Sequence, residues 1–223
     1  MQISLIFSAH FQMRNSSYIK SAFLALLLFS TTSLFAFDTE YWGIGSKSEL
    51  FEDPQPYVTL EANYSKVLNR QVQFGGYGIG FDFDGASIGL TYYRLRSNVF
   101  TARYSNGADW KFRMNYLSLQ LSQRLYQTGK WHVVAALGNG FGQIRLQEGD
   151  VDRGKHGVYI FEPGVDARYT IVSWLGLSAQ AGYRLCFPGG PPTVGDLSST
   201  KFNIGFSIMA IPLYEAIKSK DFS

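Results

Sequence analysis

The segment 174–185, WLGLSAQAGYRL, alternates between two kinds of residue at every position. One set of positions is apolar: Leu175, Leu177, Ala179, Ala181, Tyr183 and Leu185. The other set is polar or small: Gly176, Ser178, Gln180, Gly182 and Arg184. Because successive side chains of a strand point to opposite faces, the pattern predicts a strand with one apolar face. That face must meet either a protein core or lipid.

The same period of two recurs through the rest of the chain, and no amphipathic helix is evident after residue 37. Glycine contributes 23 of the 223 residues and aromatic residues 16%. Together these features predict an all-β fold. We expect eight strands, at 57–67, 71–82, 86–96, 111–126, 131–146, 158–170, 174–186 and 200–211.

The connections between the expected strands differ in length. FDG, QTGK and VSW follow the second, fourth and sixth strands, whereas longer loops at 97–110, 147–157 and 187–199 follow the third, fifth and seventh. Long loops on one side and strands of about ten residues are typical of barrels in the outer membrane. We therefore predict an eight-stranded antiparallel up-and-down transmembrane β-barrel over 57–211. A soluble, lipocalin-like barrel with the apolar face inside is the alternative.

Small residues on the polar faces favour the membrane barrel, because eight strands leave an interior only wide enough for side chains. These residues are Gly76, Gly78, Gly80, Gly89, Gly138, Gly140, Gly142, Ser178, Gly182, Gly205 and Ser207. We expect lysines and aromatic residues near strand ends to form girdles at the two membrane interfaces. They are Lys66, Lys111, Lys130, Lys155, Lys201, Tyr57, Tyr64, Tyr126, Trp131, Trp174 and Phe202. We therefore expect the Leu175/Leu177 face to meet lipid.

The N-terminal segment has the order of a secretory signal peptide. A basic stretch from Arg14 to Lys20 precedes an apolar run that ends near Ala36, and the run is too short to span a membrane. We assign 1–36 to the signal peptide, with 1–12 as an over-extended start if Met13 is the initiator. We assign 37–56 to a pre-barrel periplasmic segment and 212–223 to a periplasmic tail.

Charge and cysteine content exclude several function classes. The net charge of the chain is +3, and cleavage after Ala36 would remove two basic residues and lower it to +1. This near balance argues against nucleic-acid binding. The single cysteine, Cys186, excludes an intramolecular disulfide framework and a cysteine-based metal site. We expect no metal and no cofactor.

The last expected strand carries a pattern that ends many outer-membrane barrels, polar-x-Gly-x-x-apolar-x-apolar. NIGFSIMA matches it with Asn203, Gly205, Ile208 and Ala210, although Ala210 replaces the usual terminal aromatic residue and the chain continues. On this architecture the chain resembles the small eight-stranded outer-membrane proteins of the A, X and W group. The resemblance implies a location in the bacterial outer membrane, insertion by the barrel assembly machinery, and a monomer.

Six charged residues are expected to point into the barrel. The alternation turns Glu61, Glu162 and Asp166 inward among the acids, and Arg124, Arg168 and Arg184 among the bases. Because buried charges are costly unless they are paired, we expect these six to form a salt-bridge lattice that fills the lumen. A narrow channel for small or apolar solutes, lined by the same charges, is the alternative.

A basic patch surrounds the loop after the third expected strand. It comprises Arg94, Arg96, Arg103, Lys111 and Arg113, opposed only by Asp109. Arginine suits phosphate groups through its charge and its forked geometry. We therefore expect this patch to contact lipopolysaccharide.

A lipid A-modifying enzyme is the second alternative, and the sequence argues against it. The lipid A deacylases carry His-x-Ser-Asn, and here Ser105 and Asn106 match but Arg103 replaces the histidine. Arginine stays protonated and cannot act as a general base. His156, Asp150 and Asp152 share a loop without a motif that links them. We therefore expect a structural or loop-mediated binding role, and not an enzyme.

Overall fold

The computed structural model describes residues 54–220, apart from 68–69, 84, 98, 102–109, 149–150 and 190–196. The predicted signal peptide at 1–36, the segment 37–53 and the tail beyond residue 220 lie outside the described residues. The described residues all belong to one compact unit.

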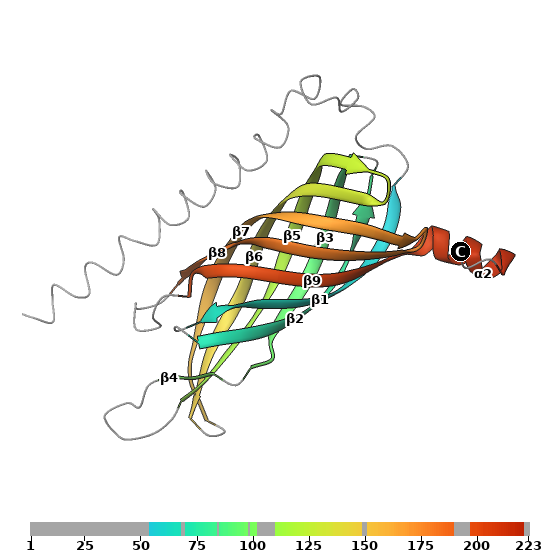
Figure 1. Cartoon of the computed structure of the whole chain (residues 1–223). Helices are drawn as coiled ribbons and strands as arrows, with labels where there is room; N and C mark the ends of the chain where they lie inside the picture. Colours follow the sequence, from blue (N-terminus) through green and yellow to red (C-terminus); the bar gives the residue numbers. More distant parts are fainter. Residues whose placement is uncertain are drawn as a thin grey trace, which may run out of the picture. The chain divides into compact units, whose positions relative to one another are not determined.

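A closed β-barrel makes up this unit (Figure 1). The elements are β1 (Gln55–Val67), β2 (Arg70–Asp82), β3 (Ala86–Leu95), β4 (Val99–Thr101), β5 (Trp110–Thr128), β6 (Trp131–Glu148), β7 (Val151–Val172), β8 (Leu175–Pro188), β9 (Ser199–Met209) and α2 (Ala210–Ser219). Each strand pairs antiparallel with its neighbours, β1 pairs with β9, and β3 pairs with β5. The short β4 pairs with β5 beyond the end of β3 and so continues the third strand. The predicted eight-stranded antiparallel up-and-down barrel is confirmed.

Because the number of strands is even, the first strand begins and the last strand ends at the same end of the barrel. β1 begins and β9 finishes at one end, which we call the termini end. The turns after β2, β5 and β7 lie at this end and are short, because β3, β6 and β8 each begin within four residues of the previous strand. The opposite end, which we call the loop end, carries the remaining connections.

Strands β6 and β7 extend further than predicted at the loop end, whereas β5 begins within one residue of its predicted start. β6 runs to Glu148 and β7 starts at Val151, so the expected loop at 147–157 is wrong over most of its length. These three strands contain 19, 18 and 22 residues, and they project beyond β1 and β2 in Figure 1.

A helix follows the last strand, which corrects the expectation that no helix occurs after residue 37. β9 ends at Met209, two residues before the predicted end of the strand, and α2 runs from Ala210 to Ser219. Pro212 lies in the first turn of α2, where a missing backbone N–H costs no hydrogen bond. Among the described helices, none is both long enough and apolar enough to cross a membrane.

The outward face of the strands is a continuous apolar band. Its most exposed side chains are aliphatic and aromatic: Val58, Leu60, Ile79, Phe81, Ile88, Leu90, Leu117, Phe141, Val165, Phe202, Ile204 and Phe206. The small residues of the other face point inward, and a Cβ atom added to Gly78 would meet Thr59 and Thr91 inside the barrel. The apolar and polar faces thus lie where the sequence analysis placed them.

Toward the loop end the two faces are exchanged, so that apolar side chains point inward and polar side chains point outward. Phe112, Met114 and Tyr116 of β5 are buried inside the barrel, and Ile144 and Leu146 of β6 join them. Their outward neighbours are polar: Lys111, Arg113, Asn115, Gln143 and Arg145. The projecting part of the barrel therefore has an apolar core and a polar exterior, as expected for strands that stand in water.

Candidate functional site

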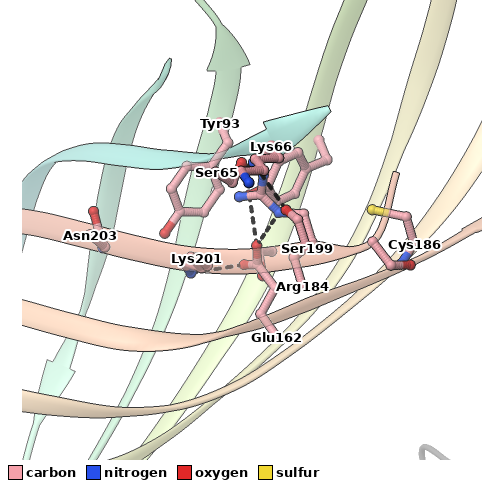
Figure 2. A network of polar contacts seen from close by, with 12 residues as sticks. Ser65, Lys66, Tyr93, Glu162, Arg184, Cys186, Ser199, Lys201 and Asn203 are labelled. Carbon is pink, nitrogen blue, oxygen red and sulfur yellow. Dashed lines mark hydrogen bonds and ion pairs between the residues drawn. The ribbon is translucent and has the colours of Figure 1, made fainter. Parts of the chain in front are cut away.

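A fully buried ion cluster crosses the interior of the barrel. The Glu162 carboxylate of β7 accepts hydrogen bonds from Arg184 of β8 at 2.6 Å and from Lys201 of β9 at 3.0 Å (Figure 2). Arg184 has no exposed surface, and Glu162 and Lys201 have almost none. One carboxylate thus faces two cations in a water-excluded site.

Further contacts hold the Arg184 guanidinium in a single position. It donates to the Ser65 hydroxyl at 2.8 Å and to the Tyr116 hydroxyl at 2.7 Å. Its carbon lies 4.4 Å from the centre of the Phe74 ring, which is a cation–π distance. The Tyr116 hydroxyl also donates to Glu162 at 3.1 Å. Four strands besides β7 and β8 therefore contribute to one connected network.

An apolar cluster fills the barrel between this network and the loop end. Its members are Val67, Val72, Phe74, Tyr93, Leu95, Phe112, Met114, Tyr116, Ile144, Leu146, Val158, Ile160, Cys186 and Leu197. All of them are nearly inaccessible to solvent. Because such side chains pack closely and exclude water, this layer acts as a plug.

A polar cavity occupies the interior toward the termini end. Its volume is about 160 Å³, and Phe83, Gly85 and Ser173 from two turns line it, so it reaches that end of the barrel. Arg168 projects into it and pairs with Asp166 at 2.8 Å and Asp82 at 3.6 Å. The same guanidinium donates to Ser122 at 3.0 Å.

The structure places the six predicted lumen charges in two groups. Glu162 and Arg184 lie in the buried cluster, whereas Glu61, Arg124, Asp166 and Arg168 line the cavity. Glu61 accepts hydrogen bonds from Tyr93 and from Asn203 at 2.7 Å. Arg124 donates to Gln127 at 2.8 Å. All six point inward, as the alternation predicted.

Two inward residues were predicted to lie elsewhere, and a third inward residue was not predicted at all. Lys201 and Tyr57 were expected in the interfacial girdles, but Lys201 is buried against Glu162 and Tyr57 lines the cavity. Asp82, which pairs with Arg168, was not among the predicted lumen charges. The parity of β9 could have found Lys201, because it shares its face with Asn203 and Gly205.

A second candidate site lies on the outer face near the loop end. The register pairs Arg113 of β5 with Arg145 of β6, and Arg145 with Lys155 of β7. We call these three residues the basic row. Like charges directly opposite each other destabilise a sheet, and among the residues whose side chains the structure describes, no carboxylate forms an ion pair with any of the three. The row therefore suits an external anion.

An aromatic row lies beside the basic row, on the side nearer the termini end. The cross-strand register aligns Tyr77, Tyr92, Leu117, Phe141, Tyr159 and Phe187 on the outer face. The Phe141 and Tyr159 rings lie 5.2 Å apart, and Tyr159 lies 5.8 Å from Phe187. Aromatic residues prefer the interface between hydrocarbon and water. The basic row thus lies nearer the loop end than the aromatic row.

The predicted lipopolysaccharide patch overlaps this region. Arg94 of β3 and Arg96, which follows β3, are exposed on the outer face, and Lys111 and Arg113 are on the outer face of β5. Arg96 donates to the Tyr77 hydroxyl of the aromatic row. Arg103 lies outside the described residues. Arg145 and Lys155 were not among the predicted patch residues, and Lys155 lies in the segment 147–157 that was taken for a loop.

The residues considered for catalysis lie mostly outside the described part of the chain. Ser105 and Asn106 lie outside the described residues, as does Asp150. The described residues hold no group of three or more His, Cys, Asp or Glu side chains arranged to bind a metal ion.

No family model and no curated protein sequence matches the chain. Among solved structures, Neisserial surface protein A aligns with a TM-score of 0.54 and 14% sequence identity, over 71% of this chain and 100% of that chain. At this identity the likeness concerns the fold alone. It agrees with the closed eight-stranded barrel of small outer-membrane proteins that the strand register forms.

Two other solved structures align with lower TM-scores. Ail of Yersinia pestis has a TM-score of 0.43 and 9% identity, over 70% of this chain and 96% of that chain. A major outer membrane protein from Thermus thermophilus has a TM-score of 0.45 and 11% identity, over 70% of this chain and 99% of that chain.

Proposed function

We propose that the protein is a monomeric barrel of the bacterial outer membrane that binds lipopolysaccharide at its loop end and has a structural or binding role. The barrel assembly machinery would insert it with the termini end toward the periplasm. The proposal assigns no reaction and no cofactor to the barrel. Its lumen, blocked by the buried cluster and the apolar plug, serves as a rigid core.

The observation that carries the proposal is the basic row above the aromatic row. Arg113, Arg145 and Lys155 repel one another unless an anion lies against them. Lipopolysaccharide carries phosphate groups at the hydrocarbon–water interface of the outer leaflet, where this row would lie. Arg94, Arg96 and Lys111 extend the basic surface along the neighbouring strands, and arginine forks match phosphate oxygens in pairs.

The test is the affinity of the refolded full chain for purified lipopolysaccharide, measured by titration calorimetry in detergent. We expect Arg113→Ser combined with Arg145→Ser to weaken binding roughly tenfold or more, because a hydrogen bond to a charged group contributes about 1.5–3 kcal/mol. Arg96→Ser combined with Arg103→Ser tests the neighbouring part of the patch in the same way.

A matched control removes the same charge elsewhere. Lys130→Ser combined with Lys218→Ser alters the termini end and leaves the basic row intact. This variant is expected to bind as the unaltered chain does. Equal affinities for all variants would contradict the proposal.

A further inference from the structure

Helix α2 presents three different sectors around its axis. Pro212, Leu213 and Ala216 face the barrel, where α2 contacts β1 and β9, and Ala216 is buried. Glu215 and Ser219 lie on a polar, exposed sector. The helix begins immediately after β9 and extends from the termini end of the barrel (Figure 1).

The third sector is exposed and carries three large apolar side chains beside Lys218. Ile211 is 41% exposed, Tyr214 66% and Ile217 58%. Their spacing of three residues places them on one side of a helix. A helix of a water-soluble protein would turn such a side toward its core. Here the barrel covers a different sector, so this side needs another partner.

The outward apolar band of the barrel reaches the start of α2. Phe206 and Ile208 of β9 and Val58 of β1 are outward residues of the band close to the start of α2. Lys218 lies in the last turn of the helix and Lys220 follows it, so cationic side chains accompany the apolar ones. Tyrosine and lysine beside aliphatic residues are typical of a helix in a membrane interface.

We propose that α2 lies in the interface of the lipid leaflet at the termini end of the barrel and anchors that end to phospholipid. Ile211, Tyr214 and Ile217 lie among the headgroups and upper acyl chains, and Glu215 and Ser219 face water. The inference rests on the proposed membrane location of the barrel. A second copy of the chain is a poorer partner, because a stable interface buries about 1,200 Å² or more and one side of a ten-residue helix offers far less.

The test measures where single side chains of α2 lie when the barrel is in a membrane. The full chain with Cys186→Ala is refolded into vesicles of phosphatidylethanolamine and phosphatidylglycerol. A nitroxide is attached at one position at a time, using Tyr214→Cys, Ile217→Cys, Glu215→Cys and Ser219→Cys. The rate at which the nitroxide collides with oxygen, which concentrates in lipid, is compared with the rate at which it collides with a water-soluble nickel complex.

We expect the oxygen-to-nickel accessibility ratio to be several-fold higher at 214 and 217 than at 215 and 219. Phe206→Cys, in the barrel band, is the reference for lipid contact. Water-like ratios at all four helix positions beside a lipid-like ratio at Phe206→Cys would overturn the inference and leave the proposed function intact. A water-like ratio at Phe206→Cys would overturn both. Dipolar broadening between labels at 214 would indicate a second copy and would also overturn the inference.

Discussion

At the scale of single residues, Glu162 is the centre of the interior. It is the carboxylate that neutralises both Arg184 and Lys201, at 2.6 and 3.0 Å. Removing one member of a buried ion pair is costly because it leaves an uncompensated charge in a site that water does not reach. The network therefore depends more on Glu162 than on either cation.

Glu162→Gln is expected to lower the free energy of unfolding by about 3–5 kcal/mol, because the amide keeps the volume of the side chain but removes its charge. The change is measured as a shift in the urea midpoint of the refolded full chain. The folded fraction at each urea concentration is read from the gel mobility of unheated samples. Adding Lys201→Met to this variant is expected to restore part of the loss.

Glu215→Gln is the control for this experiment, since Glu215 is exposed on α2. It removes the same charge and is expected to leave the midpoint unchanged. A Glu162→Gln midpoint equal to that of the unaltered chain would show that the cluster contributes little to stability.

At the scale of elements, the alternation of residues was sufficient to predict the strands and most of their inward faces. Period two depends only on strand geometry, so it identifies Arg184 and Glu162 as inward whatever surrounds them. It does not report where a strand leaves the membrane. Lys201 was assigned to an interfacial girdle because it lies near a strand end, and 147–157 was taken for a loop although β6 and β7 extend into it. The polarity reversal along β5 is the signal that could have located the boundary.

Strands β7 and β8 approach closely at a glycine pair, Gly164 opposite Gly182. A Cβ atom at Gly182 would lie 2.9 Å from the Gly164 Cα atom. Gly182→Val is therefore expected to destabilise the barrel by about 1–3 kcal/mol, as overpacking does, and the urea midpoint measures it. Ala181→Val, at the adjacent position on the exposed outer face, should be tolerated. Equal effects of the two substitutions would contradict the assigned faces.

The polarity reversal along β6 leads to a third prediction. In a Cys186→Ala background, intact cells that express the chain are treated with a membrane-impermeant maleimide. Arg145→Cys is expected to react because it lies on the outer face of the projecting part. Ile144→Cys is buried in the plug and Leu137→Cys lies in the lipid-facing part of the strand, so both should stay unmodified. Modification of Leu137→Cys would mean that the membrane boundary lies elsewhere.

At the scale of the whole molecule, the interior consists of three layers along the barrel. The apolar plug lies toward the loop end, the Glu162 cluster follows, and the cavity of about 160 Å³ reaches the termini end. The sequence analysis anticipated charges in the lumen but not the apolar layer, since inward apolar residues contradict the simple pattern of a membrane barrel. A cavity that ends at a packed layer gives ions no continuous aqueous route.

We therefore expect no discrete current steps from the refolded full chain in a planar lipid bilayer. Gel mobility of the unheated sample confirms that the barrel has folded before a silent trace is interpreted. The matched comparison is a variant with a less densely packed plug, Phe74→Ala combined with Phe112→Ala. It removes two large side chains that are fully buried inside the barrel. Current steps from the unaltered chain would favour the narrow channel, with Glu61, Asp166 and Arg168 lining its path. Steps from the plug variant alone would identify the apolar layer as the barrier to ions.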